Sequence, residues 1–195
     1  RKLAQSAAWK QETTFWDLFN SGFDGTHTIA EGSAIFDQAN ALLKSGTTWS
    51  NEPATAGALS PSTYEAALEH FDNMYNEAGM PIKYSPYLLV IHPSWKWMAR
   101  RLIQTEKMPQ SADNDVNPYN RDENSGMQYL TNPYITTANN WFVLSRDHGF
   151  DWYWRKKMQF KSSDDFNTGN AMFKSTGRWS IVNLDPRGAY GNPAS

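Results

Sequence analysis

A stretch near the C-terminal end of the chain alternates between two kinds of side chain, and it constrains the fold more than any other feature. The apolar set is interrupted only by Lys156 and consists of Trp152, Trp154, Met158 and Phe160. The intervening set is more polar and consists of Tyr153, Arg155, Lys157, Gln159 and Lys161. A period of two is typical of a β-strand with one polar face.

A second strand follows this segment. Residues 162–169 form a polar turn, and residues 171–184 return with strand-forming side chains, interrupted by Gly177. Two such segments joined by a turn predict a long antiparallel hairpin.

The clearest helix start lies at Ser60. A serine suits the N-cap position, and Pro61 suits the first helical position, where its missing N–H costs nothing. Apolar residues then recur at steps of four and three, namely Tyr64, Leu68, Phe71, Tyr75 and Ala78. Gly79 and Pro81 are typical of a helix end. We therefore predict a helix over residues 61–78.

The remaining segments complete an α+β pattern. We predict helices over residues 2–20 and 93–106, with a weak helical patch over 35–43 inside an irregular connection. Strands are expected at 87–91, which is apolar throughout, and at 128–130 and 141–144. A polar loop occupies residues 109–124. Helices and strands mix without a repeating strand-helix order, which favours α+β.

Composition narrows the class of protein. The 195 residues suit one large domain or two small ones, and 39% of them are hydrophobic, enough for a sizeable core. Eighteen basic and twenty acidic residues lack the basic excess of a dedicated nucleic-acid binder. The absence of cysteine excludes disulfides and thiolate metal sites. The high aromatic content suits a sugar-binding surface or extensive subunit contacts.

Candidate metal sites are weak. Asp113, Asp115 and Asn117 alternate as in a calcium loop, and Glu123 follows near the expected distance. However, Pro118 occupies the position that needs glycine, and Asn124 occupies the twelfth position. A solvated Asx-rich loop is the favoured interpretation. The histidines are scattered without the spacing of a zinc site: His27, His70, His92 and His148.

No arrangement of residues specifies a reaction. His92 lies between a strand and a helix, where a capping or hydrogen-bonding role is expected. The adjacent carboxylates, Asp164-Asp165 and Asp122-Glu123, are interpreted as facing water. The sequence contains neither a phosphate-binding glycine loop nor a nucleophile elbow. We therefore assign no catalytic, cofactor-binding or metal residues and predict neither an enzyme nor a cofactor.

Two surface groups favour contacts with a partner. The basic cluster Arg155, Lys156, Lys157 and Lys161 could contact phosphate or acidic loops of a neighbouring subunit, and we favour the second. Trp95 and Trp97, with Arg100-Arg101, could form an aromatic platform. Tryptophans two positions apart on a helix point to different sides, so one is expected in the core and one at an interface.

Four stretches form an ordered pattern: the helix before Asp24-Gly25, Leu59-Ser60-Pro61, PYLLVIHP at residues 86–93, and the ending at residues 185–191. Taken together, they resemble tailed-bacteriophage major capsid proteins of the Hong Kong 97-like fold. The helix ending before Asp24-Gly25 resembles that family's spine helix. Ser50-Asn51 and Leu59-Ser60-Pro61, followed by Gly79-Met80-Pro81-Ile82, resemble the stretch before its central strand. The run from Pro86 to Pro93 (PYLLVIHP) resembles its Pro-x-Leu-Leu-Val-x-Pro motif, with Ala99-Arg100-Arg101 following.

The resemblance continues to the end of the chain. The family's loop with asparagines is matched by Asn117 and Asn120, and its next two motifs by Pro133-Tyr134 and Trp141-Phe142-Val143-Leu144. The C-terminal sequence is similar to that of Mu-like head subunits: Asp185-Pro186-Arg187-Gly188-Ala189-Tyr190-Gly191. Encapsulin-type compartments share this fold, but this ending favours the phage proteins. The family's N-terminal arm and extended loop would lie upstream of the first helix, so the resemblance implies a core fragment.

The resemblance implies a structural subunit with two domains. Residues 1–60 (spine helix and connection) and 148–177 (hairpin) would be peripheral, and residues 61–147 and 178–195 would be axial. Copies would assemble through hexamers and pentamers into an icosahedral shell around double-stranded DNA, in the bacterial host cytoplasm, with scaffold, portal or decoration proteins as further partners. A carbohydrate-binding or carbohydrate-cleaving domain, using residues such as Trp95 and Trp152, is the alternative.

Overall fold

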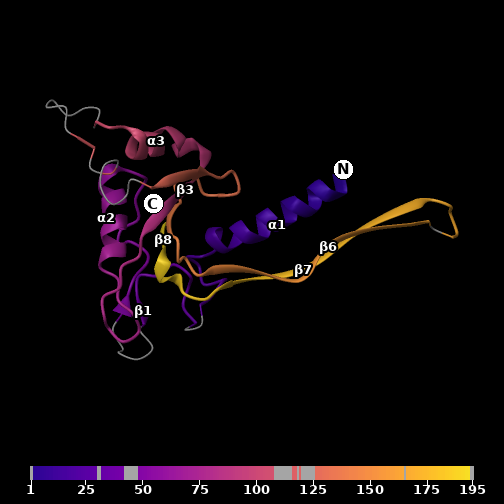
Figure 1. Ribbon diagram of the computed structural model, residues 1–195, viewed down its shortest axis with the longest axis horizontal. Helices are drawn as coiled ribbons and strands as arrows, with labels where there is room; N and C mark the ends of the chain where they lie inside the picture. Colours follow the sequence, from indigo (N-terminus) through magenta and orange to yellow (C-terminus); the bar gives the residue numbers. More distant parts are fainter. Residues whose placement is uncertain are drawn as a thin grey trace.

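A compact body and a projecting arm make up the computed structural model (Figure 1). The structure describes residues 2–29, 32–41, 48–107, 116–117, 119, 126–164 and 166–193. In the arm, helix α1 (Lys2–Asn20) runs beside the hairpin of strands β6 (Phe150–Asp164) and β7 (Ala171–Asn183). These elements confirm the predicted first helix, the predicted hairpin and the α+β class. No helix in the described ranges is long and apolar enough to cross a membrane.

The body is built on a four-stranded sheet in the order β4-β3-β5-β8. Its strands are β3 (Pro86–Ile91), β4 (Gln128–Thr131), β5 (Trp141–Ser145) and β8 (Ala189–Asn192). Strand β3 pairs with β4 in parallel and with β5 antiparallel, and β8 pairs antiparallel with the far edge of β5. The first three strands are as predicted. The fourth, β8, was not predicted.

Both faces of this sheet are covered, which gives the body two layers of core. On one face, Leu89, Ile91 and Val143 pack with helices α2 (Pro61–Asp72) and α3 (Lys96–Gln104). On the other face, neighbouring strand residues pack with α1 and the connection after it, namely Val90, Phe142 and Leu144. All five residues of β5 are buried. Successive side chains of a strand point to opposite faces of the sheet. A strand that is buried on both faces therefore has apolar residues at consecutive positions.

Helix α2 begins as predicted and ends earlier. The Ser60 hydroxyl accepts from the Thr63 N–H at 3.2 Å, and the Ser60 N–H donates to the Thr63 hydroxyl at 2.9 Å, which forms a capping box. The predicted end at residue 78 is wrong, because the helix stops at Asp72. The Asn76 side-chain oxygen accepts from the N–H groups of Ala78 and Met80, both at 2.9 Å. This side chain therefore holds a turn in place of further helix.

The predicted helix over residues 93–106 is confirmed with a modified start. Residues Pro93–Trp95 form a 3₁₀ turn (η1), and α3 continues from Lys96 to Gln104. The predicted helical patch over residues 35–43 is wrong for its described part, since Asn40–Ala41 is instead strand β1, paired with β2 (Thr48–Trp49). A second 3₁₀ turn, η2 (Pro186–Gly188), leads into β8.

A buried asparagine explains why that patch is not helical. The Asn51 side-chain oxygen accepts from the Asp37 N–H at 2.9 Å, and its amide donates to the carbonyls of Ile35 at 2.8 Å and Pro186 at 3.3 Å. Its backbone carbonyl accepts from the Gly191 N–H at 2.9 Å. Asn51 is fully buried, so it ties the connection to the C-terminal strand with no competition from water.

The hairpin contains two irregularities in β6. Trp154 pairs with Trp179, but Lys156 pairs with Arg178, so β6 has one extra residue there, and a second extra residue precedes Gln159. Cross-strand partners share a face, and neighbouring residues of β7 do not, so Lys156 lies on the face opposite Trp154. The first bulge therefore turns the Lys156 side chain away from the apolar face, whose alternation it interrupts in the sequence.

Substitution of Asn51 by alanine is expected to lower the free energy of unfolding by about 2–3 kcal/mol, because two buried carbonyls and one half-buried N–H lose their partner. Urea denaturation followed by circular dichroism measures this loss. Asn170→Ala, at an exposed position beside β7, is the matched control and should leave the midpoint within error. Equal midpoints for the two variants would contradict the role given to Asn51.

Candidate interaction surface

An aromatic cluster joins the helix of the arm to its hairpin. Phe15 of α1 lies 6.5 Å from Trp152 of β6, measured between ring centroids. Trp152 stacks on Trp179 of β7 at 5.7 Å with an interplanar angle of 17°, and Trp154 meets the same Trp179 ring edge-on at 5.8 Å. Such ring pairs add to the free energy of simple area burial. The cluster therefore fixes the base of the hairpin against α1.

The C-terminal end of α1 is anchored in the body. Phe19 is fully buried among three other phenylalanine rings, with centroid distances of 6.1, 5.2 and 4.8 Å to Phe36, Phe142 and Phe150. The Asn20 amide donates to the Tyr134 carbonyl at 2.9 Å, and its oxygen accepts from the Thr136 N–H at 3.1 Å. The helix is thus held at one end, and its N-terminal half lies along the hairpin (Figure 1).

The hairpin exposes a large apolar surface along its length. Strands β6 and β7 pair only with each other within the described ranges. Large hydrophobic side chains are exposed along them: Tyr153, Trp154, Phe160, Met172, Phe173 and, in the turn, Phe166 at 100%. A two-stranded ribbon is marginally stable alone in water, and exposed apolar patches mark contact sites. The ribbon is therefore suited to burial against another molecule.

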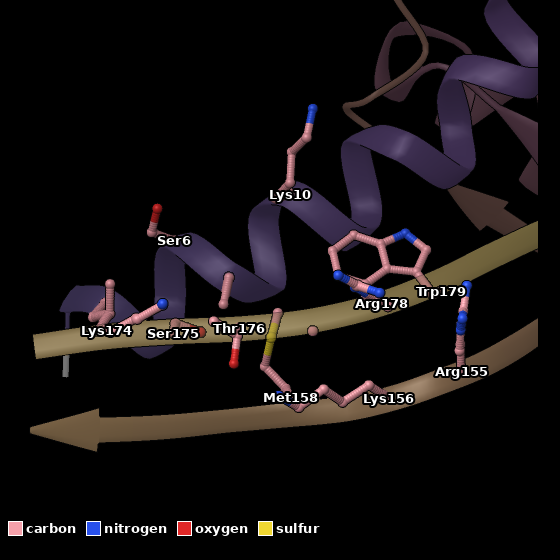
Figure 2. Close-up of a pocket in the computed structure, with 13 residues that line it drawn as sticks. Ser6, Lys10, Arg155, Lys156, Met158, Lys174, Ser175, Thr176, Arg178 and Trp179 are labelled. Atoms are coloured by element: carbon pink, nitrogen blue, oxygen red, sulfur yellow. The ribbon is translucent and has the colours of Figure 1, made fainter.

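A groove with a volume of about 910 Å³ lies between α1 and the hairpin, and we call it the basic groove (Figure 2). Five basic residues and no acidic residue line it. Figure 2 shows Arg155 and Lys156 on β6, Arg178 and Lys174 on β7, and Lys10 on the helix. Met158 and Trp179 supply apolar lining. The groove therefore combines positive charge with apolar surface.

The predicted basic cluster is only partly gathered there. Arg155 and Lys156 line the basic groove, whereas Lys157 is exposed on the same strand and Lys161 borders a second groove with Lys2 and Phe173. Sequence reasoning missed Lys10, Lys174 and Arg178. The hairpin pairing would have indicated the two residues of β7. The packing of α1 on the hairpin, which brings in Lys10, had no sequence signal.

The histidines lie apart and serve local structure. The His92 Nδ1 atom accepts from the Ser94 N–H at 3.3 Å and caps η1, which confirms its expected role. His148 Nδ1 accepts from the Phe150 N–H at 3.1 Å, and His27 lies 3.4 Å from the Asp17 carboxylate. His70 packs between the rings of Phe71 and Tyr190.

Among the residues that the structure describes, no three histidine or carboxylate side chains form a group that could hold a metal ion. Most of the calcium-like candidates lie outside the described residues: Asp113, Asp115, Pro118, Glu123 and Asn124, and with them Asp122 and Asp165. Asn117 is described and buried. Its amide donates to the carbonyls of Leu102 and Thr105, both at 2.8 Å, so it closes the end of α3.

The two tryptophans of the proposed aromatic platform separate as predicted. Trp95 packs against the core beside α3, while Trp97 is 69% exposed with the Lys96 ammonium 5.9 Å from its ring centroid. They therefore do not form one shared surface.

Truncation of Trp179 to alanine is expected to loosen the hairpin base by about 2 kcal/mol, because one stacked and one edge-on ring contact are lost at a half-buried position. Hydrogen exchange should then show roughly thirtyfold faster exchange in β6 and β7 next to the cluster, with β3 and β5 unchanged. Phe166→Ala, at the exposed turn, is the control. Unchanged hairpin protection in Trp179→Ala would refute the role of this cluster.

Stability is expected to fall as the pH drops from about 6.5 towards 4. Burial lowers the pKa of His70 to about 4, and its Nε2 atom makes no hydrogen bond with any described residue. The unfolded chain binds a proton near pH 6.5 and the native one does not, so this stabilisation is complete above that pH and decreases below it, by about 2–3 kcal/mol in total. Urea titrations across this range measure it.

The matched variants for this pH dependence are His70→Leu and His27→Gln. The first should flatten the fall in stability between pH 6.5 and 4, because no titrating ring remains at the buried position, and the second should leave it as in the wild type. A His70→Leu profile parallel to the wild type would rule His70 out as its source.

The chain is similar to known phage capsid proteins in sequence and to capsid proteins in structure. A family model described as "Phage capsid protein" matches residues 1–192. Among solved structures, the capsid of an empty GTA particle matches with a TM-score of 0.54 and 14% identity, over 97% of this chain and 64% of that one. A virus-like particle from Pyrococcus furiosus matches with a TM-score of 0.45 and 13% identity, over 73% of this chain and 56% of that one.

No match was found among curated proteins. The chain spans less than two thirds of the length of either capsid chain. The match to the GTA capsid agrees with the predicted Hong Kong 97-like fold, and neither this match nor the family supports the carbohydrate-binding alternative. With a family model matching almost its full length, the chain belongs to the phage capsid protein family.

Proposed function

We propose that this chain is a major capsid subunit that self-assembles through hexamers and pentamers into an icosahedral shell enclosing double-stranded DNA. The observation that carries the proposal is the arm, in which a ribbon that α1 covers only in part exposes aromatic side chains on a chain of the phage capsid family. A ribbon of this kind is stabilised by burial between subunits, where aromatic residues contribute large contact areas.

The division into domains forms part of the proposal. Residues 1–60 and 148–177 would form the peripheral domain, and residues 61–147 and 178–195 the axial domain. The separation of arm and body supports a division of this kind (Figure 1). The pairing of β6 with β7 continues to Phe150 and Asn183, so the hairpin as a structural unit extends past residue 177. Part of the connection, including Phe36 and Leu59, packs into the body cores.

Further partners follow from the same proposal. Packaged DNA would be contacted without sequence specificity, which suits a chain with a formal charge of −2. Scaffold, portal or decoration proteins would act during or after assembly. Assembly would take place in the cytoplasm of the bacterial host.

Electron microscopy of the full-length parent protein, expressed alone or with its scaffold, tests the proposal. Closed shells or ring-shaped oligomers are expected. The double variant Phe160→Ser, Phe173→Ser should reduce their yield at least tenfold, because both rings are exposed in the free chain and would be buried between subunits.

Gln104→Ser, at an exposed position on α3, is the control and should assemble as the wild type does. Thermal unfolding of monomers should be unchanged in both variants. Persistent wild-type monomers under all assembly conditions would overturn the proposed function.

A further inference from the structure

The hairpin carries a charge pattern that is unfavourable in isolation. Lys156 lies directly opposite Arg178, and Lys161 lies directly opposite Lys174. Like charges facing each other across a strand pair are destabilising. Lys10 of α1 adds a fifth cation beside the same surface. The ribbon therefore repels itself unless negative charge is supplied from outside.

The charge of the chain is divided unevenly between arm and body. Residues 150–183 contain six basic and three acidic residues, so the remaining residues contain twelve basic and seventeen acidic ones. The hairpin is thus net positive and the rest of the chain net negative. A second copy of this chain therefore offers the opposite charge that the hairpin requires.

The most suitable acidic surface of the body is helix α2. It contains no lysine or arginine, and its three carboxylates are exposed and spaced four and three residues apart on one side: Glu65, Glu69 and Asp72. Exposed apolar side chains follow directly after the helix, with Tyr75 at 44% and Met80 at 60%. This surface therefore mixes acidic and apolar groups, as the arm mixes basic and apolar groups.

We propose that the basic groove of one copy binds the acidic face of α2 of the next copy, so that subunits join head to tail. This contact is heterologous, because the two surfaces differ, and heterologous contacts generate rings when the rotation closes. The inference rests on the proposed function and adds to it which two surfaces meet. The phosphate backbone of DNA also carries negative charge, but it offers no apolar surface to match Met158 and Trp179, which line the groove.

Reciprocal charge reversal in the full-length protein tests this contact. The groove variant is Arg155→Glu, Arg178→Glu, and the helix variant is Glu69→Lys, Asp72→Lys. Each alone should lose at least nine tenths of its oligomers, as measured by analytical ultracentrifugation and electron microscopy. An equimolar mixture should regain the even-membered oligomers, because the two variants can alternate in them and each reversed surface then meets an opposite charge on the other variant.

The matched control is Lys96→Glu, Arg100→Glu, which changes the charge equally at exposed positions of α3. It should assemble like the wild type. Raising the salt concentration should weaken wild-type association, since exposed ion pairs are screened. Circular dichroism and thermal unfolding of each variant confirm that the monomer is folded.

Three results would overturn the inference. Normal assembly of either reversed variant would show that the contact is not used, while wild-type shells would leave the proposed function standing. A mixture that stays monomeric would show that the two surfaces do not meet. Groove variants that assemble normally but retain less nucleic acid would assign the groove to DNA instead.

Discussion

Complete burial of β5 is the constraint on which the rest of the body depends. A strand whose five side chains are all hidden needs a cover on both faces of its sheet. Helices α2 and α3 supply one cover, and α1 with the phenylalanine cluster supplies the other. Because Phe142 of β5 packs directly on Phe19 of α1, the strand that centres the body also fixes the direction in which the arm leaves it.

Asparagine side chains form hydrogen bonds with backbone groups in the irregular segments. Six of the seven buried polar residues in the described ranges are asparagines: Asn40, Asn51, Asn117, Asn132, Asn140 and Asn192. An asparagine both donates and accepts, so it can satisfy buried N–H and C=O groups of irregular segments at the same time. Asn51 does this between the connection and the C-terminal turn, and Asn20 does it between α1 and the chain before β5. In its described part, the connection between α1 and α2 is held by such bonds more than by regular structure.

The elements that could be predicted from sequence carry their signals locally. The Ser60 cap, the alternation at β6 and the apolar run of β3 each depend on a few neighbouring residues. The end of α2 could not be predicted, because the spacing of Tyr75 and Ala78 matched a helix while the Asn76 side chain formed a competing turn. Strand β8 is short and contains Gly191, so only its pairing with β5 defines it. Similarly, Arg155 and Lys156 were visible candidates, whereas Lys10 joins them only through the docking of α1.

The two bulges of the hairpin also affect its shape. Between the pair Trp154–Trp179 and the pair Phe160–Ser175, β6 contains two more residues than β7. Two strands that cover the same stretch with unequal numbers of residues cannot stay straight, so the ribbon bends and twists at this point. Gly177 of β7 lies inside the bend, where an added Cβ would lie 2.7 Å from the Met158 sulfur. The angle at which the tip of the hairpin points away from the body is therefore set by the number of residues in β6. Removing both extra residues would straighten the ribbon and redirect Phe166, while the four-stranded sheet of the body would keep its contacts.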